Sequence, residues 1–401
     1  MDKERAIYLC ATMDTKKEEA FFLKKEIELL GHRVALIDTG ILKPSPEGVE
    51  VDRETVMGPY REEIGRAKTR SEASAYMIKG LQAVTRRLFQ ENRMEGMIAI
   101  GGSGGCTLAS AAMRELPFGF PKVILTTMAS GNTLPYLQGE DIILINPVVD
   151  IQNLNFFTRH GMRQAAQVIH GLTQTKMLCP SEKRAVAITG FGVTTPCVET
   201  CNRLLQKMGF EVLIFHARGS SGGRIMEKMI REGRFCGVLD VTTSELADEI
   251  AGGIYGVGPW RLRGAVEMGI PYVVVPGALE MINLSSEDTL QPWQRERVLY
   301  RHSPSSVKMR ADRKEMEILG QLFAERLRPE KGMCSVLIPM KGFSSVNKEG
   351  GVFYDQEADT AFVENLKQNA DTRLNVRCLD VHINDEEFGQ AVVSELVSHL
   401  S

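Results

Sequence analysis

A run of small residues in the first half of the chain carries the clearest signal for chemistry. It follows the apolar stretch 96–100 and opens a stretch of helical character, 106–113. Glycines let a phosphate group approach the backbone amides, and the start of a helix offers free N–H groups and the positive end of its dipole. Thr107 and the serine of the run can add hydroxyl donors. The run consists of Gly101, Gly102, Ser103, Gly104 and Gly105.

This run predicts a phosphate-binding loop, and the alternative is a tight strand-to-helix turn that binds nothing. The spacing matches neither G-x-G-x-x-G nor G-x-x-x-x-G-K-[ST], because no lysine follows the glycines. A Rossmann dinucleotide site is disfavoured because the run does not follow the first strand of its domain. Five small residues at this point favour a ligand over an empty turn.

A second polar segment follows the next apolar run, 122–125. The carboxyl ends of parallel strands share one crevice in a doubly wound sheet, so we expect this segment to converge with the glycine run. An ordinary polar loop is an equally open interpretation. Its residues are Thr127, Met128, Ala129, Ser130, Gly131 and Asn132.

Asp14, Thr15 and Lys16 follow the first strand-like run, on the same predicted sheet edge. Lys16 could meet a phosphate, and Asp14 could hold Mg²⁺ or a ribose hydroxyl. Alternatively, Asp14 or Thr15 caps the following helix, with Glu18 completing a capping box. Asp38 ends the second strand, where related sheets grip the ribose of adenosine.

The second half of the chain offers candidates for another anionic ligand. Arginines in its glycine-rich loops could clamp a carboxylate or a phosphate. Asp240, Glu245 and His216 are candidate acid–base groups, although Asp240 or Thr242 could equally cap a helix. No nucleophile elbow, Ser-His-Asp order or metal-spaced histidine pair indicates a specific reaction. The predicted second-ligand residues are Gly192, Thr194, Arg218, Gly222, Gly223, Arg224, Thr242, Thr243 and Gly277.

Strands and helices must bring these residues together. The apolar runs 6–11 and 34–37 flank an amphipathic stretch, 18–30, and predict a βαβ unit with parallel strands. Residues 12–17 read as a polar turn. The irregular segment 41–71 is rich in proline and glycine, which predicts a lid or a cover over a sheet edge. A long helix is expected after this segment, over 72–92.

After a polar break at 178–183 the pattern restarts. Residues 184–190 mirror 5–11, and the later runs 236–240 and 271–277 mirror 95–100 and 121–127. We therefore predict an α/β protein with two Rossmann-like, doubly wound parallel-sheet domains related by duplication, at residues 1–180 and 181–401. The segment 284–310 has little periodicity, which predicts a loop or crossover arm, and it offers material for a homo-oligomer interface.

Composition bounds the partners of the chain. Its 401 residues, 43% hydrophobic and 25% charged with a net charge of −3, fit two soluble globular domains. No basic surplus exists for a nucleic-acid backbone, and no apolar run approaches the ~20 residues that span a bilayer. The charged N-terminus predicts no secretory signal, so we expect a cytoplasmic protein. None of its eight cysteines, Cys179 included, makes a C-x-x-C pair, and we expect them to be reduced.

Several long motifs resemble one family. They are CATMDTK (10–16), AIGGSGG (99–105), TTMASGN (126–132), DVTTSELADEIAGG (240–253), PYVVVPGALEMIN (271–283), RHSP (301–304), FYDQEAD (353–359) and HIND (382–385). They resemble the uncharacterised family that shares the Tm-1-like ATP-binding domain, which stands at the N-terminus of a plant tobamovirus resistance protein. The likeness covers essentially the whole chain, in order.

The resemblance implies two Rossmann-like halves, with ATP and Mg²⁺ bound in the first. The site features carry over to Gly101–Gly105, to Thr127–Asn132 and, less fully, to Asp14 and Lys16. Cys106 stands where the family pattern leads us to expect Thr. Plant relatives inhibit viral RNA replication by contacting a viral helicase-type replication protein. That role does not transfer, because those relatives have a further C-terminal domain.

Three functional hypotheses follow. The favoured one is a nucleotide-binding protein, with ATP activating a small anionic metabolite held at a second site. The second is a non-catalytic sensor or protein-interaction module that ATP stabilises. The third is a metabolite lyase or hydrolase that works with the loops of the second half.

Overall fold

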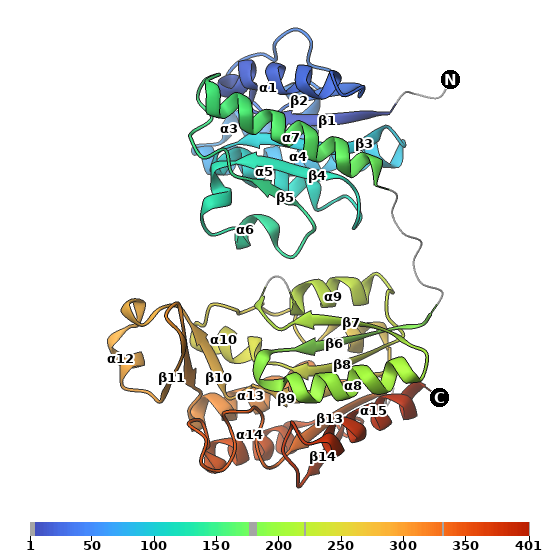
Figure 1. Cartoon of the computed structure of the whole chain (residues 1–401), viewed down its shortest axis with the longest axis vertical. Coiled ribbons are helices and arrows are strands. Elements are labelled where there is room, and N and C mark those ends of the chain that lie inside the picture. Colours follow the sequence, from blue (N-terminus) through green and yellow to red (C-terminus); the bar gives the residue numbers. More distant parts are fainter. Residues whose placement is uncertain (1–4, 176–182, 220–221, 331–332, 401) are drawn as a thin grey trace. The chain divides into compact units, whose positions relative to one another are not determined.

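The computed structural model describes residues 5–175, 183–219, 222–330 and 333–400, and the chain divides into two compact units, 1–179 and 180–401. Cys179 lies outside the described residues. In each unit helices cover both faces of a parallel sheet (Figure 1). The predicted fold class, two parallel-sheet α/β domains, is confirmed.

The first unit contains a five-stranded sheet in the order β2-β1-β3-β4-β5, with every pair parallel. Its strands are β1 (Ala6–Ala11), β2 (Val34–Asp38), β3 (Met94–Gly101), β4 (Lys122–Thr126) and β5 (Ile143–Ile145). Its helices are α1 (Met13–Glu28), α2 (Arg53–Met57), α3 (Arg61–Arg66), α4 (Arg70–Gln90), α5 (Ser103–Met113), α6 (Leu134–Leu137) and α7 (Phe156–Gln174). Two short 3₁₀ helices lie at Gly58–Tyr60 and Thr127–Ser130.

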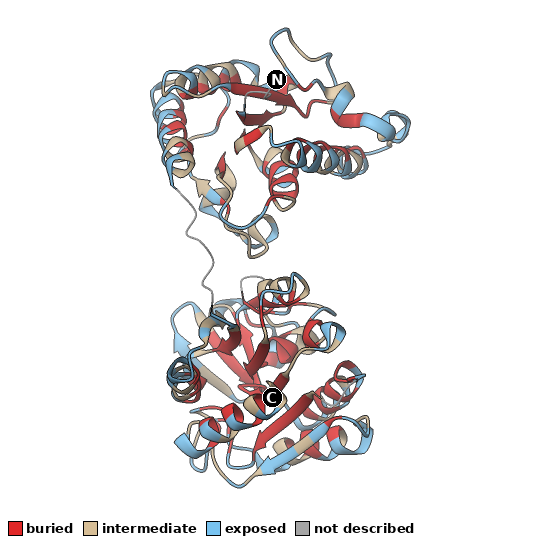
Figure 2. Cartoon of the chain, turned by 90° about the vertical axis from the view of Figure 1, so that its right-hand side faces the viewer, coloured by how far each residue is buried: buried red, intermediate tan, exposed pale blue. Residues whose placement is uncertain are grey.

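Burial of β1 on both faces explains its continuous apolar sequence. Ile7 and Leu9 join a core cluster with residues of α1 and α7, whereas Tyr8 and Cys10 join a second cluster with residues of α4 and α5. Helices α1 and α7 therefore cover one face of the sheet, and α4 and α5 cover the other. Figure 2 shows the buried strands between helices whose outer faces are exposed.

The second unit contains a six-stranded parallel sheet in the order β14-β13-β9-β8-β6-β7. Its strands are β6 (Ala185–Gly190), β7 (Glu211–His216), β8 (Gly237–Thr242), β9 (Tyr272–Gly277), β13 (Cys334–Pro339) and β14 (Asn375–Leu379). Its helices are α8 (Thr195–Lys207), α9 (Gly223–Arg231), α10 (Glu245–Ala251), α11 (Gly264–Met268), α12 (Pro292–Arg295), α13 (Arg313–Arg326), α14 (Gln356–Asn369) and α15 (Glu386–Leu400). Further 3₁₀ helices lie at Gly192–Thr194 and Glu287–Thr289.

Both sheets have the same strand order. When only the strands of each parallel sheet are counted from the start of its unit, both sheets contain the order 2-1-3-4-5, and the second sheet adds a sixth strand at its edge. In this order the chain reverses direction across the sheet between strands one and three, which leaves a crevice at their carboxyl ends. The shared order agrees with the repeated pattern in the sequence.

The segment 284–310 forms ordered structure, so the prediction of a loop or arm is wrong. Strands β10 (Met281–Leu284), β11 (Leu299–Ser303) and β12 (Ser306–Arg310) form an antiparallel sheet in the order β10-β12-β11. Pairing with β12 holds β11 in place, although β11 is largely exposed and has a polar sequence. A polar edge strand lacks the apolar alternation on which a sequence-based assignment depends.

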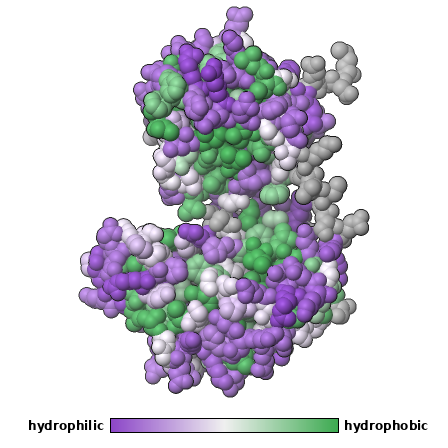
Figure 3. Space-filling view, in the orientation of Figure 1, coloured by the Kyte–Doolittle hydropathy of each residue, from purple (hydrophilic) through white to green (hydrophobic). Residues whose placement is uncertain are grey.

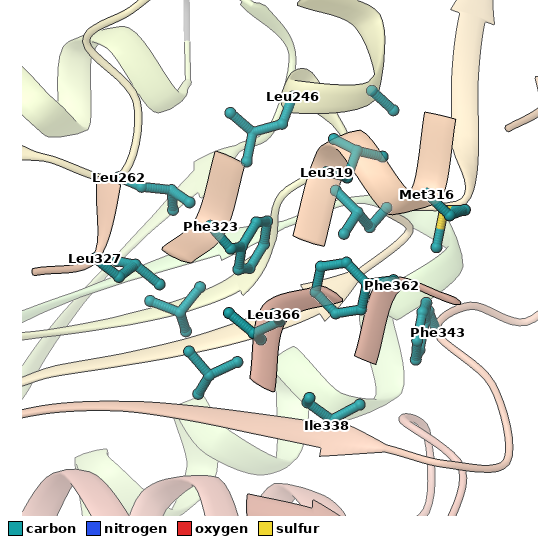
Figure 4. Packing of buried hydrophobic residues seen from close by; sticks show 14 of the residues in the cluster. Leu246, Leu262, Met316, Leu319, Phe323, Leu327, Ile338, Phe343, Phe362 and Leu366 are labelled. Atoms are coloured by element: carbon teal, nitrogen blue, oxygen red, sulfur yellow. The ribbon is translucent and has the colours of Figure 1, made fainter. Parts of the chain in front are cut away.

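The largest core cluster of the second unit packs α13 and α14 against the sheet (Figure 4). The rings of Phe323 and Phe362 meet edge to face, with centroids 5.1 Å apart. Gly320 allows this approach, because a Cβ at that position would lie 2.5 Å from the carbonyl oxygen of Phe362. The two helices are thereby fixed on one face of the sheet, while α8 and α15 pack against the other.

A buried arginine organises the carboxyl end of β8. Arg261 is fully buried, its Nη1 and Nη2 donate to the carboxylate of Asp240, and its Nε donates to Glu245 Oε2 at 2.6 Å. Tyr272 donates its hydroxyl to the same Asp240, at 2.7 Å. Glu227 lies at the edge of this group, and burial raises its pKa to about 7. The guanidinium therefore neutralises carboxylates that the sheet has removed from water.

The visible face of each unit mixes hydrophilic and hydrophobic residues, as Figure 3 shows. This pattern agrees with the interspersed charges of the sequence. Among the described residues, no helix has both the length and the apolar character that crossing a membrane requires.

We expect the substitution Arg261→Met to destabilise the second unit by about 3–5 kcal/mol, because it leaves buried carboxylates without a counter-ion. Both tryptophans, Trp260 and Trp293, belong to this unit, so tryptophan fluorescence during urea unfolding reports on it alone. Arg313→Met is the matched control, since the Arg313 side chain is 64% exposed and pairs with Glu317 at the surface. An equal, small effect of both substitutions would contradict the structural role of Arg261.

Candidate functional site

The glycine run lies at the strand-order reversal of the first unit, between β1 and β3. The sequence predicted a loop for this run, but the structure places it at the end of a strand and the start of a helix. Gly101 ends β3, Gly102 is the N-cap of α5, and the next three residues form the first helical turn. The amides of this turn are those that an α-helix leaves without a partner within the helix. The run is therefore the amino end of an 11-residue helix, directed at the crevice.

Packing explains only part of the glycine content. A Cβ on Gly101 would lie 3.0 Å from Gly105 Cα, and one on Gly105 would lie 3.4 Å from the carbonyl oxygen of Ile100. In contrast, a Cβ on Gly102 would meet nothing closer than 3.9 Å, and one on Gly104 nothing closer than 3.8 Å. Neither of the last two has a positive φ. A tight turn thus accounts for Gly101 and Gly105 but not for Gly102 and Gly104.

Two adjoining cavities lie at this junction. The first, of about 510 Å³, is lined by the glycine run and by Thr12, Thr15, Lys16, Arg70, Ile100 and Gln152. The second, of about 660 Å³, shares Thr12, Thr15, Arg70, Gly104 and Gly105 with the first. It adds an apolar wall that consists of Ile41, Leu42, Met57, Ile64, Ala73, Met77 and Leu108. One cavity is therefore polar and glycine-lined, and the other offers apolar surface.

Positive charge flanks the glycine-lined cavity. Lys16 lies at a kink in α1, where its φ is −126° and its ψ is 20°, and its Nζ donates to the carbonyl oxygen of Ile151. Arg70 begins α4, and the nearest atom to a Cβ on Gly104 would be Arg70 Nη2. Sequence reasoning identified Lys16 but missed Arg70. The missed signal was a concentration of basic residues in the predicted lid, which is not irregular throughout but helical over 53–66. Its residues Arg53, Arg61, Lys68 and Arg70 all line the second cavity.

Asp14 organises the segment that follows β2. Its Oδ2 accepts from the amides of Ile41 and Leu42 at 2.8 and 3.0 Å, and its Oδ1 accepts from the amide of Lys43 at 2.8 Å. Helix α1 begins at Met13, so residues 12–17 are not a turn, and its N-cap Thr12 makes no side-chain cap. The predicted capping by Asp14 or Thr15 is therefore wrong. Asp14 lines the larger cavity while its carboxylate holds a neighbouring loop.

Asp38 is buried and holds the crevice together. Its Oδ1 accepts from the amides of Met13 and Gly40, and its Oδ2 accepts from the hydroxyl of Ser45 at 2.6 Å. Asp38 is 1% exposed and already accepts these three hydrogen bonds, so it is not available in this structure to grip a ribose. Its role is to join the starts of the segments after β1 and β2.

The second predicted loop contributes less than expected. Thr127 approaches the glycine run, since its Oγ1 would be the nearest atom to a Cβ on Gly102. The remainder, Met128 to Asn132, does not line either cavity. Thr107 also turns away, because its hydroxyl donates to the carbonyl oxygen of Ser103 one helical turn earlier, at 2.8 Å.

The described residues contain no group of three or more His, Cys, Asp or Glu that could hold a metal ion. The carboxylates nearest the junction, Asp14 and Asp38, already accept backbone and hydroxyl donors. The donor set thus does not fit an Mg²⁺ ion ligated by protein carboxylates.

The predicted second-ligand residues do not form one site. Gly222, Gly223 and Gly277 are required by packing, because a Cβ on each would lie 1.6, 2.2 and 2.0 Å from a neighbouring atom. Thr194 and Thr242 are buried and share a hydroxyl hydrogen bond of 2.8 Å, and buried Thr243 donates to the carbonyl oxygen of Val275. These residues close the strand-order reversal of the second unit instead of lining it.

Of the three acid–base candidates, Asp240 and Glu245 lie together around Arg261, and His216 lies apart from them. Asp240 and Glu245 are fully buried in ion pairs with Arg261, and burial raises the pKa of Glu245. His216 is exposed at the end of β7, where its ring stacks on Phe191. Of the predicted arginines and glycines, Arg218 and Gly192 line a cavity with His216, whereas Arg224 lies on the outer side of α9. The structure thus brings together only part of the predicted set.

Comparison with known proteins places both units in one sequence family. Residues 5–177 match the model for the N-terminal domain of the uncharacterised protein family UPF0261, and residues 183–400 match the model for its C-terminal domain. A UPF0261 protein of Clostridium tetani is 39% identical over 399 residues, which cover 98% of each chain. The ToMV resistance protein Tm-1 of Solanum lycopersicum is 36% identical over 339 residues, which cover 82% of this chain and 45% of that protein.

Solved structures add no functional argument. A putative UDP-N-acetylglucosamine 2-epimerase from Listeria monocytogenes matches 68% of this chain and 79% of its own, at 12% identity and a TM-score of 0.21. A likeness at that level carries no inference about function.

We expect Asp14→Ala to loosen the segment after β2 at the cavity wall. Three backbone amides lose a charged acceptor, and hydrogen bonds to charged groups contribute about 1.5–3 kcal/mol, so exchange of these amides should accelerate at least about tenfold. Hydrogen–deuterium exchange of the peptide that contains Ile41–Lys43 measures the effect. Glu18→Ala, at an exposed position on the same helix, should leave it unchanged. Equal exchange in the two variants would contradict the assigned role of Asp14.

Proposed function

We propose that this chain, which belongs to the uncharacterised protein family UPF0261, is a nucleotide-binding protein that holds ATP at the Gly101–Gly105 junction. The proposal rests on the geometry of the first unit. The observation that carries the proposal is the open space at Gly102 and Gly104. Packing does not require glycine at either position, yet a side chain there would fill the cavity in front of a helix N-terminus. A phosphate group needs that space and those amides.

The two adjoining cavities support a nucleotide over free phosphate. The triphosphate would lie in the glycine-lined cavity, where the amides of α5, Lys16 and Arg70 offer donors and positive charge. The adenosine would extend into the larger cavity, along the apolar wall that contains Met57 and Leu108. The predicted lid supplies Ile41, Leu42, Met57 and Ile64 to that wall, so it would form part of the binding site.

Any accompanying Mg²⁺ would be held chiefly by phosphate oxygens and water, which is the usual coordination of this ion at nucleotides. Asp14 and Asp38 already accept hydrogen bonds from backbone amides and from Ser45, so no step is proposed through a protein-held metal.

We propose no reaction and no antiviral role. The tomato resistance protein and the corresponding susceptible protein match this chain alike, at 36% identity each, so the match is not linked to resistance. The enzymatic and the sensor hypotheses share the same nucleotide site, and ATP turnover separates them. A cytoplasmic location is proposed because the described cysteines are free thiols, including the helical neighbours Cys197 and Cys201. The homo-oligomer stays a prediction.

Calorimetric titration with ATP, with and without Mg²⁺, tests the proposal. We expect micromolar binding to the natural protein and at least a hundredfold loss in Gly102→Asp, because a carboxylate would occupy the place of a phosphate. Asp is a favourable N-cap, so the thermal stability of this variant should be kept. Gly102→Asn is the matched control: it has the same shape without the charge, and it should lose less affinity. No heat with ATP, ADP or AMP in the natural protein would refute the nucleotide site.

Removal of Arg70 tests the position of the triphosphate. We expect Arg70→Met to weaken ATP about tenfold, since one charge-assisted hydrogen bond is worth about 1.4 kcal/mol or more. Competition by adenosine, which has no phosphate, should change by less than twofold. Arg87→Met, at an exposed position on the same helix, serves as the control. Equal losses for ATP and adenosine would mean that Arg70 does not face the phosphates.

A further inference from the structure

A third large cavity lies in the second unit, where the residues after β6, the end of β7 and the small antiparallel sheet line it. Figure 1 shows these strands. Its volume is about 580 Å³. None of the residues that line this cavity lines the proposed ATP site. Those residues are Phe191, Gly192, Val193, His216, Arg218, Ile254, Tyr255, Met281, Tyr300, His302, Ser303, Ser305, Ser306, Lys308, Ser345 and Val346.

The chemistry of this lining is one-sided. It contains two basic side chains and two histidines, but no aspartate or glutamate. Four serines and two tyrosines supply hydroxyl groups, and Phe191, Met281 and Val346 supply apolar surface. A cavity with this composition attracts negative charge and offers hydroxyl donors to oxygen atoms.

Lys308 is a buried lysine in the lining of this cavity. It lies on β12 and is 4% exposed. Its Nζ donates to Asn283 Oδ1 at 2.5 Å, and it lies 5.0 and 5.7 Å from the ring centres of Phe191 and Tyr255. Within the described parts of the chain, no carboxylate oxygen lies within 4.0 Å of this nitrogen.

Asn283 keeps the lysine apart from the nearest carboxylate. Its Nδ2 donates to Asp248 Oδ2 at 2.9 Å, and its backbone amide donates to Asp248 Oδ1 at 2.5 Å. Asn283 therefore donates both hydrogen bonds to Asp248, and the acceptor that the described residues offer to Lys308 Nζ is a neutral amide oxygen. A buried ammonium without a paired carboxylate is rare, because the cost of its desolvation is not offset.

The electrostatics of the surrounding groups agree with this geometry. Burial lowers the pKa of Lys308 to about 8, with Asp248 opposing the shift and Arg218 adding to it. Burial raises the pKa of Asp248 to about 7. Burial lowers the pKa of His216, and the positive charges of Arg218 and Lys308 lower it further. A bound anion would relieve the electrostatic repulsion among Lys308, Arg218 and His216.

We propose that this cavity binds a small organic anion whose carboxylate or phosphate contacts Lys308, while its carbon skeleton packs against Phe191 and Tyr255. Arg218, whose Nε donates to Tyr255 Oη at 2.9 Å, is held at the same wall. The serines of the β11–β12 hairpin complete the oxygen contacts. The site lies within the second unit, and it is independent of the ATP site.

Isothermal titration of the full chain with succinate and, separately, with inorganic phosphate tests the proposal and distinguishes its two anion classes. A Cβ on Gly192 would meet open space, so that position accepts a side chain without a clash. We expect Gly192→Asp to weaken the preferred anion at least tenfold through repulsion, and the isosteric Gly192→Asn to weaken it less than threefold. Equal effects of the two substitutions would overturn the site.

The lysine is tested by Lys308→Met, which keeps the aliphatic stem and removes the charge. We expect at least a tenfold loss of anion affinity, and no loss in Lys314→Met, which alters an exposed lysine of the same unit. Both carboxyl groups of succinate are close to fully ionised above about pH 7, so its own charge is constant through the titration of Lys308. Its affinity should therefore fall above about pH 8, as Lys308 loses its proton.

Two further outcomes would overturn the proposal. One is no measurable binding of succinate or phosphate to the natural protein at millimolar concentration. The other is binding that is lost in Gly102→Asp and kept in Gly192→Asp, which would assign the anion to the first unit. Loss of ATP binding alone would leave the proposal unaffected, because the two sites share no residue.

Discussion

The reversal of strand order between the first and third strands is the constraint on which both units depend. Chain segments leave these neighbouring strands toward opposite faces of the sheet, so no backbone fills the space between their carboxyl ends. Each unit must resolve that space with side chains or a ligand. In the first unit the residues around it are glycines, threonines and a lysine, which leave it open. In the second, Thr194 and Thr242 meet across it and Arg261 secures the carboxylates beneath.

The same topology therefore has two outcomes. At Gly102 and Gly104 the space that a side chain would fill is open. At Gly223 and Gly277 neighbouring atoms already occupy that space, so only glycine fits. In the second unit an open volume lies beside the added antiparallel sheet. That sheet contributes Lys308, Tyr300 and several serines, so the two cavities differ in chemistry as well as in position.

Much of the framework was predictable, because buried parallel strands have continuous apolar sequences. The runs that begin at Ala6, Lys122, Ala185 and Tyr272 were all identified, and so was the repeat of the pattern after residue 183. The failures occurred where pairing or charge overrides local pattern. Strand β11 is polar and is held by β12, and α1 begins five residues before its amphipathic stretch because Met13 packs into the core.

The sequence alone determined the fold class, the two-domain repeat and the presence of a small-residue junction after a buried strand, since each depends on local composition. Only the tertiary structure decided which polar residues are available. Asp38, Asp240 and Glu245 look identical to catalytic carboxylates in sequence, yet each is buried and already accepts hydrogen bonds from other parts of its unit. Arg70 and Lys308 look like ordinary surface charges, yet folding places them at cavities. Hydrogen-bond partners and burial are set by contacts between segments far apart in the chain, and sequence spacing does not encode them.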